Sequence, residues 1–244
     1  MMSAPPARSA ALAAAAVAAL AACSDGGTPH DASIDTPPGT CGADATFTGE
    51  IVDWDSTSAA FCGVFGATFT VRGDAARKSM TAPNGRFSLC VPAQGQTIVE
   101  IAPPTAASEC PGLSGNAMNK YMLGGIAIAS QVVIAAGGAY SARAMVEPRL
   151  VTMGTQIGAA LDESLGQLVV HVDGTPRAVS ISAAHDATQS HNGVKWDAGD
   201  TGSDVLFPNV AVGPATITVA GGAVGTGSYM IDRGVMTYLT VAVR

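Results

Sequence analysis

The chain of 244 residues has little positive charge, with 12 lysines and arginines against 19 aspartates and glutamates and a net charge of −7. Binding to nucleic acid depends on clustered cations that contact phosphates, so this class of partner is excluded. An anionic lipid surface would not attract the chain by charge either. Charged residues of both signs make up only 13% of the chain. This composition is more typical of exported all-β proteins than of cytosolic helical ones.

The sequence also lacks the motifs on which common enzyme chemistries depend. No histidine is followed by a glutamate three residues later, and no His-Glu-x-x-His occurs, so the usual zinc-hydrolase spacings are missing. No serine lies in a Gly-x-Ser-x-Gly turn, and no glycine-rich loop is suited to hold a phosphate. We therefore predict no catalytic residues, no metal site and no cofactor, and a protein that is not an enzyme.

Aromatic residues make up only 5% of the chain, which is low for a dedicated sugar-binding protein. The two tryptophans, Trp54 and Trp196, each lie between two charged residues. Such neighbours favour a partly exposed ring, of the kind that stacks on a sugar. The other interpretation is that each ring fills one end of a hydrophobic core. Trp54 and Trp196 are the candidate ligand-binding residues, with both interpretations open.

The first 23 residues have the features of an export signal. Arg8 precedes an apolar, alanine-rich run that ends at residue 22 and is too short to span a bilayer comfortably. The end of the run, Leu-Ala-Ala-Cys, resembles the lipobox of bacterial lipoproteins. That resemblance implies a signal peptide over residues 1–22 and a lipid on Cys23; the alternative is an ordinary secretion signal that contains a cysteine. We expect an exported protein anchored to the cell envelope, at the outer membrane if the host has two membranes.

Residues 23–45 are rich in Ser, Asp, Gly, Thr and Pro and almost free of large apolar side chains, which predicts a flexible, disordered tether. Beyond the tether, apolar residues alternate with polar ones, as at residues 67–72 and 167–172. A period of two, interrupted by turn residues, predicts half-buried strands rather than helices.

An internal repeat divides the rest of the chain. Gly49–Asp53 opens the first copy and Gly166–Val170 opens the second, and later apolar segments recur in the same order. The repeat predicts two copies of one module, residues 46–148 and residues 166–244. They are joined by a linker, residues 149–165, that holds a short helix. Each copy is expected to close with a hairpin-like pair of strands.

Residues 81–89, Thr-Ala-Pro-Asn-Gly-Arg-Phe-Ser-Leu, resemble the turn-and-strand signature of carboxypeptidase regulatory-like domains, which share a transthyretin-like (prealbumin-like) β-sandwich. The first copy contains the other family elements at Gly49–Asp53, Gly66–Val71 and Pro92–Gly95. The second copy departs from the pattern, since it lacks the Asn-Gly-x-Phe turn and has a long polar loop over residues 185–204. The resemblance implies an all-β fold of two tandem seven-stranded transthyretin-like β-sandwiches.

Four cysteines follow Cys23, and an even number in an oxidising compartment predicts two disulfides. Zinc binding is the competing interpretation, but the spacings are long and contain no Cys-x-x-Cys pair. In the family that the first copy resembles, strand one pairs antiparallel with strand four, and strand two with strand five. That topology implies the bonds Cys41–Cys90 and Cys62–Cys110.

Two segments have a second interpretation. Loop 185–204 holds two histidines and several aspartates, so it is either a solvated loop or a metal or ligand site, although it lacks the regular spacing of a calcium loop. The apolar stretch Met122–Tyr140 is long enough for a transmembrane helix, but the repeat places two strands there.

These features together predict a non-catalytic cell-envelope lipoprotein that acts as a structural, adhesion or interaction module. The alternative is a carbohydrate-binding surface lipoprotein. The expected partners are the lipid bilayer, reached through acylated Cys23, and an envelope protein or a glycan.

Overall fold

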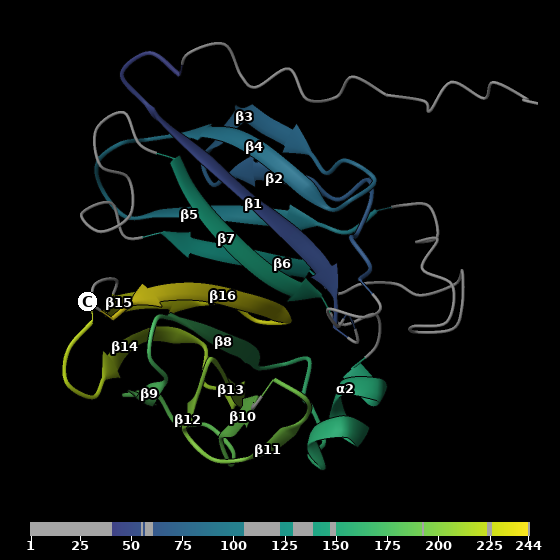
Figure 1. Cartoon of the computed structure of the whole chain (residues 1–244), viewed down its shortest axis with the longest axis vertical. Helices are drawn as coiled ribbons and strands as arrows, with labels where there is room; N and C mark the ends of the chain where they lie inside the picture. Colours follow the sequence, from purple (N-terminus) through teal and green to yellow (C-terminus); the bar gives the residue numbers. More distant parts are fainter. Residues whose placement is uncertain are drawn as a thin grey trace, which may run out of the picture. The chain divides into compact units, whose positions relative to one another are not determined.

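The computed structural model describes residues 41–54, 56, 61–104, 123–128, 139–146, 150–191, 193–223 and 226–243. The expected signal peptide and most of the expected tether, including Cys23, lie outside these residues. Within them the fold consists of sixteen strands and one helix, so the all-β class predicted from the sequence is confirmed (Figure 1).

The first repeat forms two sheets, with strand orders β4-β1-β7 and β3-β2-β5-β6. β1 pairs antiparallel with β4, and β2 with β5, as the family resemblance implies. β1 also pairs with β7, in parallel. The strands are β1 (Ala45–Asp53), β2 (Thr68–Val71), β3 (Asp74–Met80), β4 (Arg86–Val91), β5 (Thr97–Ala102), β6 (Leu123–Ile128) and β7 (Ala139–Val146).

The second repeat follows helix α2 (Leu150–Ile157), which lies within the expected linker. Its sheets contain the orders β13-β8-β16 and β12-β9-β14-β15, which match the first repeat strand for strand. The strands are β8 (Gly166–Asp173), β9 (Arg177–Ile181), β10 (Gln189–His191), β11 (Trp196–Ala198), β12 (Thr201–Gly202), β13 (Asp204–Val210), β14 (Gly213–Val219), β15 (Gly227–Ile231) and β16 (Val235–Ala242).

The two repeats share one sheet. β6 of the first repeat pairs in parallel with β16 of the second, from Leu123 opposite Val235 to Ala127 opposite Leu239. This pairing joins nine strands in the order β11-β10-β13-β8-β16-β6-β5-β2-β3. Within the first repeat, Gly124 of β6 leaves room for the Ile101 side chain of β5, since a Cβ atom there would lie 3.2 Å from Cδ1 of Ile101.

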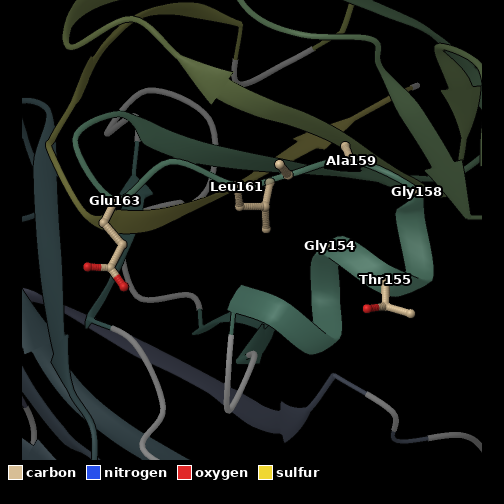
Figure 2. Close-up of a pocket in the computed structure, with 7 residues that line it drawn as sticks. Gly154, Thr155, Gly158, Ala159, Leu161 and Glu163 are labelled. Atoms are coloured by element: carbon tan, nitrogen blue, oxygen red, sulfur yellow. The ribbon is translucent and has the colours of Figure 1, made fainter.

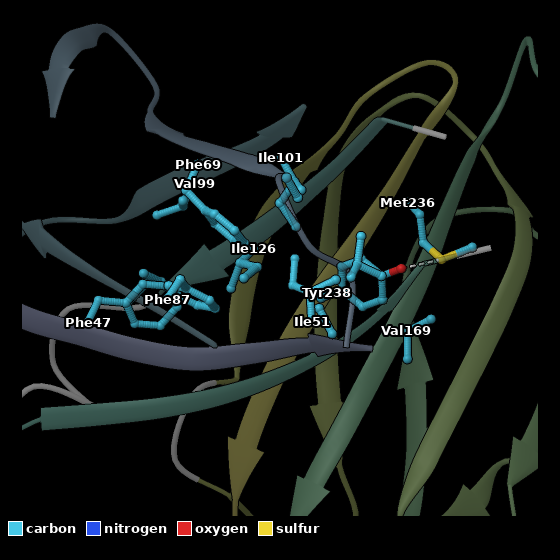
Figure 3. Close-up of a cluster of buried hydrophobic side chains, with 14 of the residues drawn as sticks. Phe47, Ile51, Phe69, Phe87, Val99, Ile101, Ile126, Val169, Met236 and Tyr238 are labelled. Carbon is cyan, nitrogen blue, oxygen red and sulfur yellow. Dashed lines mark hydrogen bonds between the residues drawn. The ribbon is translucent and has the colours of Figure 1, made fainter. Parts of the chain in front are cut away.

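The hydrophobic core of the first repeat also continues into the second repeat. Side chains of β8 and β16, among them Val169 and Tyr238, pack in the same core as Phe69 and Phe87 of the first repeat (Figure 3). The rings of Phe69 and Phe87 stack with their centroids 4.1 Å apart. Leu168, next to Val169, packs in the second core. β8 is therefore buried on both faces, and not half-buried as the alternation predicts.

The hairpin expected at the end of the second repeat, between residues 229–231 and 236–243, is wrong, because β15 and β16 belong to different sheets. The hairpin expected at the end of the first repeat, between residues 132–134 and 140–146, stays a prediction. A strand that crosses to the opposite sheet has the same local pattern as one that folds back on its neighbour, so the sequence does not separate the two. Residues 132–134, expected in the first hairpin, lie outside the described residues.

Strands are found in the two segments for which the sequence left a second interpretation open. Loop 185–204 holds the three short strands β10, β11 and β12, so it is not a simple solvated loop. The described parts of the Met122–Tyr140 stretch belong to β6 and β7. Across the described ranges, no helix has the length and apolar character needed to cross a membrane.

The disulfide between Cys41 and Cys90 is present, with the Cα atoms 5.5 Å apart, so this pairing is confirmed. It connects the residues before β1 to the end of β4, where Thr46 lies opposite Cys90. Cys62 is also disulfide-bonded. Its expected partner, Cys110, lies outside the described residues, so the Cys62–Cys110 pairing stays a prediction.

Candidate functional site

The two candidate ligand-binding residues lie against each other. Trp54, directly after β1, and Trp196, the first residue of β11, stack with ring centroids 4.8 Å apart and an angle of 5° between the ring planes. Trp54 is only 4% exposed, and Trp196 is half-buried against the first core. The pair therefore connects the two repeats, and Trp54 fills core space instead of presenting a face to solvent.

A tight turn after β1 holds Trp54 in place. The backbone nitrogen of Ser56 donates to the carbonyl of Asp53, and the Ser56 hydroxyl accepts from the backbone nitrogen of Cys62, both at 2.9 Å. The signature turn of residues 81–89 packs directly behind this turn. Gly85 has a φ of +76°, and a Cβ atom there would lie 2.1 Å from the carbonyl oxygen of Ile51. The glycine of the signature thus serves both the turn and this close backbone approach.

Trp196 is held by the short ladder between β10 and β11, in which it lies opposite His191. The His191 ring is 5.1 Å from the Trp196 ring, and its Nδ1 accepts a hydrogen bond of 3.2 Å from the backbone nitrogen of Gly193. We call Trp54, Trp196 and His191 the aromatic cluster.

The indole nitrogen of Trp54 is buried and has no hydrogen-bond acceptor in the part of the chain that the structure describes. A buried N–H without an acceptor costs about 1–3 kcal/mol. A ligand oxygen would satisfy this donor only if the surrounding core opened. In the observed packing, Trp54 therefore does not act as a sugar platform.

A cleft of about 580 Å³ lies beside helix α2 (Figure 2). Helix α2 ends at Ile157, and Gly158 follows it with a φ of +69°. The Ala159 nitrogen donates to the Gly154 carbonyl at 3.0 Å, as in a Schellman cap. Thr155 and Glu163 supply polar side chains to the cleft, but Figure 2 shows them on opposite sides of it. The described lining residues are Gly154, Thr155, Gly158, Ala159, Ala160, Leu161 and Glu163. Small side chains without a convergent polar pair suit neither a catalytic site nor a sugar platform.

Asn209, which the sequence interpretation missed, ties the cleft segment to the second repeat. Its side-chain oxygen accepts from the Asp162 nitrogen at 2.8 Å, and its amide nitrogen donates to the Ala160 carbonyl and the Asp186 carboxylate, each at 2.7 Å. Its φ of +52° is unusual for a residue other than glycine, and asparagine tolerates it well. No local sequence pattern marks these long-range contacts.

His171 and His185 each contact an oxygen atom of a neighbouring residue. Nδ1 of His171 lies 2.8 Å from Oδ1 of Asp204 on the neighbouring strand, and Nδ1 of His185 lies 2.6 Å from the Asp186 carbonyl. Among the described residues, no group of three or more His, Cys, Asp or Glu side chains is placed to hold a metal ion.

The shifted pKa values of Tyr229 and Asp162 follow from structural contacts and not from a catalytic arrangement. Burial in the second core raises the pKa of Tyr229 to about 12. Hydrogen bonds from Ser164, with a backbone nitrogen at 2.7 Å, lower the pKa of Asp162. The carboxylate of Asp162 thereby closes a turn after α2.

Comparisons with known proteins give little similarity. No family model matches the chain, and no curated protein matches it. Solved structures that it is weakly similar to include the shaft pilin SpaA of Lactobacillus rhamnosus GG, at 8% identity and a TM-score of 0.25, over 83% of this chain and 98% of the pilin.

Two others are a minor pilin of Streptococcus agalactiae and a carbohydrate-binding module of family CBM26 from Eubacterium rectale Amy13K, in complex with maltoheptaose. The minor pilin has 10% identity and a TM-score of 0.21, over 81% of this chain and 94% of its own. The binding module has 9% identity and a TM-score of 0.23, over 82% of this chain and 94% of the module. At these scores the similarities carry no argument about function.

Proposed function

We propose that the protein is a non-catalytic lipoprotein of the cell envelope that acts as a structural, adhesion or interaction module. In this proposal an acyl chain on Cys23 anchors it, and residues 24–45 hold the folded repeats away from the membrane. The lipobox-like sequence before Cys23 supports the anchor. A single acyl chain binds a membrane only marginally, so the diacylglyceryl group and the further acylation of the lipoprotein pathway are both part of the proposal.

The observation that carries the proposal is the joining of two repeats into one body. Residues Ser33–Arg244 form one compact unit, in which the repeats share a nine-stranded sheet and a hydrophobic core. Polar contacts between the repeats add to this, since Arg72 binds Asp232, and the Gln96 amide donates to the Ser228 carbonyl at 2.7 Å. Two modules fixed to each other suit a spacer or scaffold.

We also propose that each repeat is a transthyretin-like β-sandwich, with the first of the carboxypeptidase regulatory-like type. The β1–β4 and β2–β5 pairings, the Cys41–Cys90 bond and the glycine turn at Gly85 support this assignment. The module boundaries follow the repeat, at residues 46–148 and 166–244.

The partner in this proposal is an envelope protein, with a glycan as the alternative. Carbohydrate binding through the aromatic cluster would rest on Trp196, because Trp54 is buried. A glycan array that compares the native protein with Trp196→Ala tests this alternative. Binding that is lost in the variant favours a glycan, whereas silence together with specific capture of an envelope protein favours the leading proposal.

The anchor is tested by expression in a bacterial host with a radiolabelled fatty acid. The native chain is expected to take up label and to fractionate with membranes, while Cys23→Ala takes up none and is released. Ser24→Ala is the matched control, because it changes the neighbouring residue and leaves the thiol in place. A Cys23→Ala chain that stays on the membrane would show that the lipid is not the anchor.

A further inference from the structure

We propose that the protein is built to bear load, with each repeat acting as a clamp against tension along the chain. The chain enters each repeat at the start of its first strand and leaves at the end of its last strand. In both repeats these two strands are parallel neighbours, β1 beside β7 and β8 beside β16. This inference goes beyond the function proposed above, because it concerns how the fold resists force and not what the chain binds.

The parallel pairing sets the direction in which the strand ladder is loaded. Tension pulls the first strand from its N-terminal end and the last strand from its C-terminal end. In a parallel pair these two ends lie at opposite ends of the ladder, so the strands are drawn lengthwise past each other. All the hydrogen bonds between the strands are then stretched together, whereas a pull on two adjacent ends would open them one after another.

Both clamps extend over most of the strands that form them. The first ladder runs from Thr46 opposite Ala139 to Asp53 opposite Val146. The second runs from Gln167 opposite Met236 to Asp173 opposite Ala242. Side chains of β8 and β16 are buried in both cores, so water has little access to the second ladder, and its hydrogen bonds are stronger for that reason.

The Cys41–Cys90 disulfide strengthens the point where tension enters from the tether. Cys41 lies just before β1, and Cys90 lies on β4 opposite Thr46. Tension that arrives before Cys41 therefore reaches β4 through a covalent bond as well as through β1. β1 cannot slide along β4, and the chain between the two cysteines stays closed even after the repeat has unfolded.

The shared sheet passes load between the repeats. β16, the strand at which the second repeat ends, is paired on its other side with β6 of the first repeat. Arg72 of the first repeat also binds Asp232, in the turn before β16. Tension on β16 is therefore carried by both repeats, and not by the linker with α2 alone.

Single-molecule force spectroscopy tests the clamp with two attachment geometries on the same ladder. In both, one handle follows residue 244. The second handle is placed at Glu163, before β8, or at Thr175, just after it, through a reactive non-natural side chain that leaves the cysteines intact. Both sites are exposed. The Glu163 geometry pulls β8 and β16 lengthwise, whereas the Thr175 geometry pulls their adjacent ends apart.

The rupture force at one loading rate is expected to be several times higher with the handle at Glu163 than at Thr175. Equal thermal unfolding midpoints of the two labelled proteins serve as the control for folding. Equal rupture forces, or a higher force from Thr175, would overturn the clamp.

A second arm pulls the mature chain from its tether and from residue 244, with and without reductant. Reduction is expected to lengthen the released chain by about 170 Å, which is 49 residues at roughly 3.5 Å each. An unchanged length would show that the disulfide does not lie in the load path.

Discussion

Replacing Tyr238 with alanine is expected to destabilise both repeats together. Tyr238 belongs to β16 of the second repeat, but its ring is 3% exposed and packs in the core of the first repeat. Truncation of a buried aromatic side chain costs about 3–5 kcal/mol. With an m-value of about 2 kcal/mol/M, the midpoint of urea unfolding would fall by roughly 2 M. The confirmed disulfide Cys41–Cys90 stabilises the first repeat only. If the repeats were independent, the second repeat would therefore unfold at a lower urea concentration than the first.

The assay follows each repeat separately during urea unfolding. Near-ultraviolet circular dichroism of the stacked tryptophans reports on the junction, and hydrogen exchange of β4 and β14 amides reports on the two repeats. We expect coincident transitions in the native protein and in Tyr238→Ala. Met230→Ala, at an exposed position of β15, is the control and should change stability little. Loss of the second repeat at lower urea, with the first repeat unshifted, would refute the shared core as the source of stability.

Three further predictions concern single positions. The stacked pair of Trp54 and Trp196 should give an exciton couplet in circular dichroism that Trp196→Ala abolishes; a couplet that persists would contradict the stack. The pKa of Tyr229 is about 12 in the folded protein and about 10 in the unfolded chain, so the folded state binds the proton more tightly. The free energy of unfolding is therefore at its full value below about pH 10 and falls by roughly 2–3 kcal/mol as the pH rises to 12. Tyr229→Phe should remove this loss in denaturant titrations, and an unchanged pH slope would count against it. Gly85→Ala should lower the thermal unfolding midpoint far more than Gly95→Ala, because both glycines have a positive φ but only Gly85 lies against nearby backbone. Similar decreases in the two variants would show that the positive φ, and not the close backbone approach, causes the destabilisation.

Much of the first repeat was predictable because its signals are local. The alternation of Phe87 and Leu89 with polar residues marks β4, and the Asn84–Gly85 pair marks the turn before it. The Cys41–Cys90 bond followed from the strand pairing of the family that the repeat resembles. In each case a few neighbouring residues, or a known topology, carry the information.

The joining of the repeats was not predictable, because a parallel pairing between distant strands leaves no local mark. β6 and β16 are more than 100 residues apart in the sequence, yet they are hydrogen-bonded neighbours. One signal was present in β8, where Leu168, Val169 and Val170 are consecutive apolar residues. Such a run indicates a strand buried on both faces, as in sheets covered on either side.

The candidate site was located from the sequence in part. The sequence singled out Trp54 and Trp196, but their charged neighbours favoured exposure. Asp53, next to Trp54, is itself buried, so a charged neighbour is a poor guide to the exposure of a ring at the end of a strand. The stacking of the two rings depends on the tertiary arrangement, which no spacing in the sequence encodes.

The shared nine-stranded sheet has a consequence for how this protein can be divided or can have diverged. Cutting the chain at the linker would leave β6 and β16 as open edges and would expose the apolar side chains of Val169 and Tyr238, a combination prone to aggregation. Removing or exchanging either copy would therefore leave an unpaired strand and an apolar face on the other, so each copy is expected to need the other for its stability.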